Sequence, residues 1–314
     1  MWFAPSGSFI FLPDRAHPVG PLVSVQGAPP ATGPGAIYFV DIFVRKATLA
    51  EKFFPWLREG AEIIPASALL APGVSDAARA QQDQREMTRS QQVAAALALT
   101  AAGYKVYAKP TGALVDNVVA NAPAAGLVQL TDVVVSIDGK PVREFTDLRR
   151  LLATHRPGDT VAIGLRRGAQ SKTVNVKLVP SPLDPKRGVI GIVVSQAADI
   201  RLPRKVTINA RGVGGPSAGL AFALDILEQL GHNVDHGCRV AATGEVDLAG
   251  DVLPIGGITQ KVIGVRRTGI RVFLVPAGDN AVEAKRHAGG VRVIPVSSFQ
   301  QALHALATLP AKCA

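Results

Sequence analysis

The chain has 314 residues, of which 47% are hydrophobic and 18% charged, and its formal net charge is +10 at pH 7. These values are typical of a folded protein with a sizeable core, exclude a largely disordered chain, and leave room for two domains. Cys238 and Cys313 are too few for a disulfide framework, and the 6 histidines show no metal-ligand spacing. We therefore expect neither a metal nor another cofactor.

The chain lacks the patterns that indicate nucleotide hydrolysis or a membrane span. No Gly-x-x-x-x-Gly-Lys-Ser/Thr motif occurs, so we expect any activity to be independent of ATP. No apolar stretch is long enough to cross a bilayer. The first residues, Met1-Trp2-Phe3-Ala4-Pro5, lack the basic start and long apolar region of a signal peptide.

The first hundred residues predict three elements. Residues 37–44 are β-branched and aromatic, which is typical of a strand, and residues 49–57 have the pattern of a short amphipathic helix. A longer helix is predicted over residues 85–103, where Gly103 ends it.

Residues 104–182 form a separate module of strands around one helix. A strand is predicted over residues 133–137, followed by the turn pair Asp138-Gly139. A short helix is predicted over residues 145–154, and the alternating apolar residues within 161–178 predict a hairpin.

The segments 121–127 and 132–142 are similar to bacterial PDZ domains, although Thr131-Asp132 stands where those domains usually have Gly-Asp. The resemblance implies binding of extended chains, commonly hydrophobic C-termini, by addition of a strand to an open sheet edge. It places the groove at the strand of Gly112, Ala113, Leu114 and Val115 and at the helix residues Leu148 and Leu152. Each leucine suits the core of a small sheet equally well.

Positive charge is concentrated in this module. Residues 140–187 contain 11 Lys and Arg against 4 Asp and Glu, a balance of +7. Such a surface attracts an anionic lipid surface or steers substrates, with plain solubility as the simpler explanation. No nucleic-acid motif accompanies it, so we expect no nucleic-acid partner. Residues 180–188, with three prolines, predict the linker that leaves the module.

Ser217 stands in the run Gly214-Gly215-Pro216-Ser217-Ala218-Gly219, directly before a helix predicted over residues 218–230. Backbone N–H groups converge at a helix N-terminus. Together with the backbone of Gly214 and Gly215 they predict an oxyanion hole beside the serine hydroxyl.

Lys261 lies in the first turn of a second predicted helix, over residues 259–268. The positive end of that helix and the apolar neighbours of the lysine both disfavour an ammonium ion, which favours a neutral amine that can take a proton from a hydroxyl. Thr243, in the run Thr243-Gly244-Glu245, is placed to hydrogen-bond and orient that amine.

The runs 215–219 and 243–245, and the run Leu253-Pro254-Ile255-Gly256-Gly257 that precedes Lys261, resemble the signature of the Lon peptidase domain. The resemblance implies that Ser217 is the nucleophile, Lys261 the general base, and Thr243 the residue that positions the lysine. Many Lon proteases have aspartate at the position of Gly214. The Gly-Gly variant resembles the smaller branch that has a PDZ domain and no ATPase.

A rival interpretation uses the same serine. Gly215-x-Ser217-x-Gly219 also satisfies the nucleophile-elbow pattern of α/β-hydrolases, which would make the protein an esterase-type enzyme. Such an enzyme needs an acid and then a histidine downstream, with Asp251 or Asp279 and His287 or His304 as candidates. The polar, glycine-rich approach to Ser217 is unlike the buried strand that precedes such an elbow.

In Lon peptidase domains a strand and then a helix with the pattern Met-x-x-Ser-x-x-x-Ala precede the serine segment, and residues 37–44 and 87–94 resemble that order. The strand before the serine would then be residues 206–209. We therefore expect an α+β fold in which residues 1–103 and 183–314 form a Lon-type protease domain of mixed sheets and helices. Residues 104–182 would be a PDZ domain inserted into it.

The resulting hypothesis is an ATP-independent serine endopeptidase that cleaves unfolded proteins or exposed tails. The resemblance also implies a homo-oligomer, by analogy a ring of six, at the extracytoplasmic face of the cell membrane, with an anchor ahead of this chain. The non-enzymatic alternative is a PDZ scaffold or holdase. The intact set of Ser217, Lys261 and Thr243 argues against that alternative.

Overall fold

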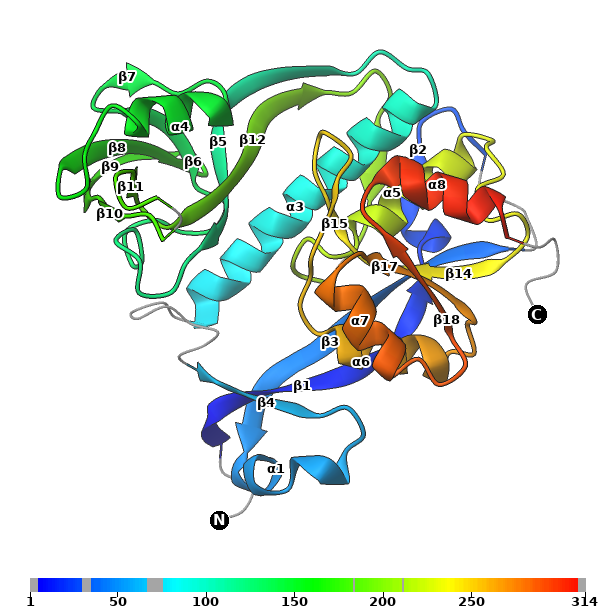
Figure 1. Cartoon of the computed structure of the whole chain (residues 1–314). Helices are drawn as coiled ribbons and strands as arrows, with labels where there is room; N and C mark the ends of the chain where they lie inside the picture. Colours follow the sequence, from blue (N-terminus) through cyan, green and yellow to red (C-terminus); the bar gives the residue numbers. More distant parts are fainter. Residues whose placement is uncertain (1–4, 30–34, 67–75, 183, 211, 310–314) are drawn as a thin grey trace. The chain divides into compact units, whose positions relative to one another are not determined.

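The computed structural model describes residues 5–29, 35–66, 76–182, 184–210 and 212–309. Residues 1–4 and Cys313 lie outside these ranges. The chain divides into two compact units (Figure 1). Unit 1 comprises residues 1–70, 83–106 and 202–314, and unit 2 comprises residues 71–82 and 107–201. Unit 1 is therefore assembled from stretches on both sides of unit 2 in the sequence.

A mixed six-stranded sheet forms the centre of unit 1, in the order β18-β17-β14-β3-β1-β4. One half is parallel, from β18 to β3, and the other half is antiparallel, from β3 to β4. The strands are β1 (Pro5–Pro18), β3 (Ala36–Thr48), β4 (Glu62–Pro65), β14 (Arg239–Ala242), β17 (Val272–Pro276) and β18 (Arg292–Val296). The parallel strands β14 and β17 are almost wholly apolar, as expected of strands covered on both faces.

The helices of unit 1 supply its buried apolar faces. Helix α5 (Gly219–Gln229) is buried along nearly its whole length, and Phe222 packs its ring near Phe39 of β3. The other helices are α1 (Leu49–Phe53), most of α3 (Asp76–Ala101), α6 (Ile258–Arg267), α7 (Asp279–Arg286) and α8 (Phe299–Ala307). Smaller elements are the 3-10 helices η1 (Gly20–Leu22) and η2 (Pro55–Leu57), the pair β2 (Val23–Val25) with β13 (Val206–Ile208), and the pair β15 (Glu245–Val246) with β16 (Val252–Leu253).

Helix α6 lies unusually close to the sheet because two glycines remove side chains from the contact. A Cβ on Gly264 would stand 1.9 Å from the carbonyl oxygen of Asp14. Gly257, the N-cap of α6, has a positive φ of 67°, and a Cβ there would meet Ile42 at 2.8 Å. These contacts fix the height of α6 above β1 and β3, and with it the position of every side chain the helix carries.

Unit 2 is a second sheet, in the order β12-β5-β6-β8-β9, with β7 paired to β6. One helix, α4 (Phe145–Leu152), packs on it over a core that includes Val134, Ile163 and Val176. The strands are β5 (Tyr107–Val118), β6 (Val133–Ile137), β7 (Lys140–Pro141), β8 (Thr160–Arg167), β9 (Gln170–Lys177) and β12 (Ile192–Arg201), with the short pair β10 (Val179–Pro180) and β11 (Gly188–Val189) beside them.

The end of unit 2 differs from the sequence expectation. Residues 180–188 do not lead out of the unit, because the chain returns through β11 and adds β12 to the sheet as a pair with β5. Unit 2 therefore extends to Arg201, beyond the expected boundary at residue 182. The missed signal is a long-range strand pairing, which local sequence patterns do not report.

Among the described residues, no helix combines the length and the apolar character needed to cross a membrane.

Candidate active site

Ser217 lies at the end of the glycine-rich loop that leads into α5, two residues before the first helical residue. Its carbonyl oxygen accepts hydrogen bonds from the N–H of Gly244 at 2.8 Å and from the hydroxyl of Thr243 at 3.1 Å. On the other side, the hydroxyl of Ser90 in α3 donates to the carbonyl of Pro216 at 2.9 Å. The backbone around the serine is thus fixed by groups from two separate elements.

Lys261 is the fourth residue of α6, and its side chain reaches the serine. Its Nζ lies 2.6 Å from the Oγ of Ser217 and 3.1 Å from the Oγ1 of Thr243. Only 2% of the lysine is exposed, and Thr243 is fully buried. The structure therefore brings together the three side chains that the sequence singled out, from the α5 loop, the end of β14 and α6.

Burial lowers the pKa of Lys261 to about 7, from an ordinary value of 10.5. An ammonium ion loses its hydration in such a site, so the neutral amine is favoured. The carboxylate of Asp41 acts in the opposite direction and raises the pKa of the lysine. Near neutral pH a large share of the molecules therefore hold a neutral amine against the serine hydroxyl.

The backbone N–H of Gly215 is not available for the expected oxyanion hole. The N–H of Gly215 donates to the carbonyl of Asp83 in α3 at 3.1 Å, so it is engaged elsewhere. Gly214 also lies against Asp83, because a Cβ on this glycine would stand 2.9 Å from the Cβ of that aspartate. The expectation for Gly215 is wrong here, since its N–H is bonded to the backbone of α3.

The N–H groups of Ser217 and Ala218, just before α5, are better placed to bind an oxyanion. The next two N–H groups, of Gly219 and Leu220, donate to the carbonyls of Pro216 and Gly244, respectively. Within the described part of the chain, the N–H groups of Ser217 and Ala218 have no hydrogen-bond acceptor. These two donors flank the serine hydroxyl along the backbone, which makes them the better candidates for binding an oxyanion.

The rival arrangement with a histidine does not assemble at this serine. His287 is the C-cap of α7 and His304 lies in the last turn of α8. In the described ranges, the side chain that contacts the hydroxyl of Ser217 is Lys261, and neither histidine bonds to it. Among the described residues, no hydrogen bond or ion pair joins Asp251 or Asp279 to His287 or His304, so neither acid orients a histidine.

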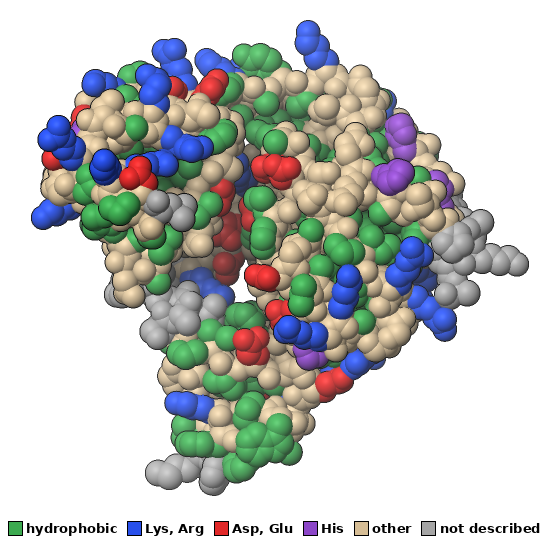
Figure 2. Space-filling view, viewed as in Figure 1, with side chains coloured by type: hydrophobic (Ala, Val, Ile, Leu, Met, Phe, Trp, Pro, Cys, Tyr) green, Lys and Arg blue, Asp and Glu red, His purple; other side chains and the backbone are tan. Residues whose placement is uncertain are grey.

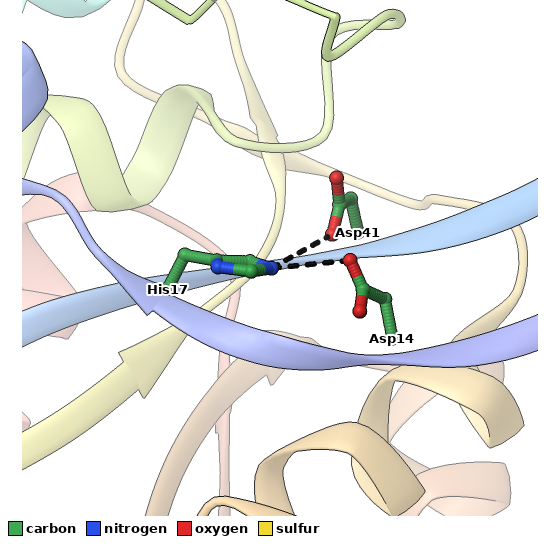
Figure 3. A group of neighbouring side chains, drawn as sticks. All are labelled: Asp14, His17 and Asp41. Atoms are coloured by element: carbon green, nitrogen blue, oxygen red, sulfur yellow. Dashed lines mark hydrogen bonds and ion pairs between the residues drawn. The ribbon is translucent and has the colours of Figure 1, made fainter.

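Sequence reasoning missed a group formed by Asp14, His17 and Asp41 (Figure 3). The Nε2 atom of His17 lies 3.1 Å from Asp14 and 3.9 Å from Asp41, and the three potential metal-ligand atoms lie within 4.8 Å of one another. The group comes from two strands, β1 and β3. Their pairing is not visible in the sequence, where His17 stands alone among the histidines.

The expected peptide groove of unit 2 needs a correction. Residues Gly112 to Val115 lie on β5, which pairs with β12 on one side and with β6 on the other. Ala113, Leu114 and Val115 are buried, and a Cβ on Gly112 would strike the carbonyl of Val134 at 2.5 Å. This strand therefore has no open edge. Among the described strands, the open edge beside α4 is β12, which lies beyond the range 104–182 expected for the PDZ domain.

The two leucines of α4 differ in their surroundings. Leu148 is only 2% exposed and belongs to the core, whereas Leu152 is half-buried at the edge of that core. The start of α4 is tied to β12, because the N–H of Phe145 donates to the Oε1 of Gln196 at 3.2 Å. Lys and Arg side chains gather on the face of this unit shown in Figure 2.

Comparisons with known proteins find two families along the chain. Residues 83–178 match the PDZ domain family, and residues 199–307 match the Lon protease (S16) C-terminal proteolytic domain. The chain is 38% identical over 91 residues to Lon protease of Mesomycoplasma hyopneumoniae, a match that covers 28% of this chain and 10% of that protein. It is 33% identical over 98 residues to Lon protease 2 of Bacillus subtilis, covering 31% of this chain and 17% of that protein. With the Archaeal Lon protease of Archaeoglobus fulgidus the identity is 35% over 95 residues, covering 29% and 15%.

The matches thus span well under a fifth of these curated relatives. Among solved structures, the PDZ domain of the SdrC-like protein from Listeria monocytogenes is 25% identical and covers 27% of this chain and 87% of that one, with a TM-score of 0.25. The chain combines a C-terminal proteolytic domain of the Lon protease type with a PDZ domain.

Proposed function

We propose that the protein is an ATP-independent serine endopeptidase in which Ser217 is the nucleophile and Lys261 the general base. The observation that carries the proposal is the 2.6 Å contact between the buried amine of Lys261 and the hydroxyl of Ser217. Similarity to Lon proteolytic domains supports a peptidase, and the buried lysine supports this particular chemistry.

Thr243 orients the base. Its hydroxyl has one proton, which it donates to the carbonyl of Ser217, so its lone pairs face Lys261. A neutral amine that donates one N–H to Thr243 can then direct its own lone pair toward Ser217. The threonine thereby sets the direction in which the lysine accepts a proton.

The reaction follows from this geometry. Lys261 accepts the proton of Ser217 as the serine Oγ attacks the carbonyl carbon of the scissile peptide bond, and the N–H groups of Ser217 and Ala218 stabilise the oxyanion. The ammonium then donates its proton to the leaving amine as the carbon–nitrogen bond breaks and an ester with Ser217 remains. Finally, Lys261 takes a proton from water as the water attacks the ester, and the return of that proton to Oγ releases the serine.

The PDZ unit would select the substrates. An extended chain can add a strand to the open edge of β12, beside α4, which suits unfolded segments or C-terminal tails. The lysines and arginines of this unit would favour acidic substrates or an anionic membrane surface. Assembly into a homo-oligomer and a site of action outside the cytoplasm remain part of this proposal.

The direct test compares wild type with Ser217→Ala and Lys261→Ala on casein and on short unstructured peptides, without ATP. Each substitution should lower the rate by at least about a thousandfold, because the two residues act as one unit. His287→Ala and His304→Ala are matched controls and should keep the wild-type rate. Loss of activity in either control, or a normal rate in Lys261→Ala, would refute the proposed dyad.

The pH dependence is a second test of the same proposal. Since burial places the pKa of Lys261 at about 7, kcat/KM should fall below that pH, where the amine becomes protonated, and should level off above it. A profile that stayed flat between pH 5 and 9 would show that no group with this pKa controls the reaction.

A further inference from the structure

Large apolar side chains are exposed around α1 and η2 of unit 1. Among the described residues, twelve large apolar side chains are exposed, and six of them lie between residues 43 and 57. Four lie within the short stretch 53–57 and are called the aromatic tip: Phe53, Phe54, Trp56 and Leu57. Trp56 is 70% exposed and Leu57 76%, and neither α1 nor η2 contains a buried residue. A soluble monomer rarely exposes such a cluster unless the surface binds something.

Polar contacts hold the backbone of this segment in place. Thr48 and Glu51 form a capping box at the start of α1, and Arg45 donates two hydrogen bonds to Glu51, at 2.9 and 2.5 Å. The rings of Phe54 and Trp56 meet edge to face, with their centroids 5.3 Å apart. The aromatic tip is therefore a preformed surface, which can bind without first paying for the ordering of a loop.

Positive charge accompanies the aromatic tip. Residues 45–58 contain four basic residues and one acid, a balance of +3, from Arg45, Lys46, Lys52 and Arg58 against Glu51. The next two acids along the chain are bound to α6, because Glu59 accepts hydrogen bonds from Arg266 and Arg267, and Glu62 accepts one from Gln260. Figure 2 shows hydrophobic side chains gathered where α1 lies in Figure 1. Segments that lie in a membrane interface combine these features, namely exposed Trp, Phe and Leu side chains beside Lys and Arg.

The charge distinguishes between two possible occupants of the surface. In a two-fold contact with a second copy of the chain, the aromatic tip would meet the same tip, and basic residues would face basic residues. A bilayer with anionic headgroups has the complementary charge, and its interfacial region accommodates Trp and Phe side chains. The observations therefore favour a lipid surface.

We propose that the aromatic tip is a membrane-binding site, in which Phe53, Trp56 and Leu57 enter the interfacial region of an anionic bilayer while the lysines and arginines of residues 45–58 contact the headgroups. The site belongs to unit 1 and is distinct from the basic residues of unit 2. It uses neither Ser217 nor Lys261, so it is independent of the proposed peptidase chemistry. Such a contact would hold unit 1 reversibly at a membrane surface.

Trp56 can report on its own environment. The sequence has two tryptophans, so Trp2→Phe leaves Trp56 as the remaining one. Vesicles made of equal parts phosphatidylglycerol and phosphatidylcholine should shift its fluorescence emission to shorter wavelength, because the indole ring leaves water. Vesicles of phosphatidylcholine alone should bind at least about tenfold more weakly, since they lack the negative charge. Equal binding to both kinds of vesicle would overturn the assignment to an anionic surface.

Vesicle sedimentation measures what each part of the site contributes. Trp56→Ser should weaken binding to the anionic vesicles at least about tenfold, and Lys52→Gln about fivefold. Val282→Ser, at an exposed apolar residue of α7, is the matched control and should bind like the wild-type protein. None of these three side chains is buried, so each variant should keep the wild-type melting temperature. Wild-type binding by Trp56→Ser would overturn the proposal.

Two further outcomes distinguish this site from other surfaces. Binding to vesicles with no change in Trp56 emission would place the contact elsewhere on the protein and would overturn the proposal. A shift in emission that grows with protein concentration without vesicles would identify a second copy as the occupant, and would overturn it as well. Ser217→Ala should bind vesicles like the wild-type protein, so failure of the proposed dyad leaves this test unaffected.

Discussion

The amine of Lys261 is buried, where an ammonium ion is poorly solvated, so protonation of this amine lowers the free energy of unfolding. The unfolded chain has a lysine with an ordinary pKa of 10.5, whereas the folded chain holds it at about 7. Between these values the unfolded state binds more protons, so stability rises with pH in this window. The destabilisation by the buried ammonium ion is largest below about pH 7 and disappears above pH 10.5.

Lys261→Met should therefore stabilise the protein while abolishing its chemistry. At pH 7 we expect the free energy of unfolding to rise by on the order of 3 kcal/mol, with the gain shrinking toward zero near pH 10.5. Denaturant titrations at pH 7, 9 and 10.5 measure it. Lys52→Met, at an exposed lysine of α1, is the control and should change little. A gain of the same size at every pH would attribute the effect to packing and not to charge.

Some residues could be predicted from sequence and others could not. Ser217 and Lys261 stand in dense local patterns, and the structure brings them to hydrogen-bonding distance. The N–H of Gly215 could not be placed, because its partner Asp83 belongs to a helix more than a hundred residues earlier. The group of Asp14, His17 and Asp41 had no local signal, since it depends on how β1, with its bulge, pairs with β3.

At the scale of elements, the strands that the sequence predicted are present, but most strands of the unit 1 sheet, namely β1, β4, β14, β17 and β18, were not predicted. Strand β6 was predicted with its observed bounds, and α4 and the β8–β9 hairpin lie within a few residues of the predicted ranges. Strand β12 was missed as part of the PDZ sheet, although it forms one edge of it. Alternation of apolar residues reports which face of a strand is buried, but not which strand lies beside it.

The position of β12 predicts where a peptide binds. A peptide with a hydrophobic C-terminus, carrying a photo-crosslinker and offered to the Ser217→Ala protein, should label β12 and α4. Labels on β9, the other edge of the same sheet, would contradict the assignment. Leu152→Lys should weaken binding by at least about tenfold by placing a charge beside the groove. The matched change Leu148→Ala should instead lower the stability of the unit, because this leucine is core.

For the whole molecule, the two ends of residues 107–201, the larger stretch of unit 2, lie side by side. Tyr107 at the start of β5 is the antiparallel partner of Arg201 at the end of β12. Their Cα atoms are therefore only about 5 Å apart, so the chain enters and leaves this stretch at nearly one point. An insertion of this kind is tolerated because the residues on either side of it need only lie close together.

Replacing residues 107–201 by a short Gly-Ser bridge should leave unit 1 folded and able to cleave short unstructured peptides, while discrimination among protein C-termini is lost. Thermal unfolding and peptide assays check both parts. Removal of residues 104–180 is the informative comparison, because it leaves β12 without β5 and exposes an unpaired apolar strand; we expect that product to aggregate. If both deletions behaved alike, β12 would not belong to the PDZ unit.

Because α6 packs so closely on the sheet, a substitution at Gly264 would displace the helix. Gly264 contributes no chemistry, yet even a methyl group there would collide with the backbone of Asp14 and lift the helix that carries Lys261. A lysine raised by a fraction of an ångström no longer meets the serine at hydrogen-bonding distance. In a survey of inactive variants, Gly264 would thus be indistinguishable from the residues that carry out the reaction, although all it supplies is an empty space.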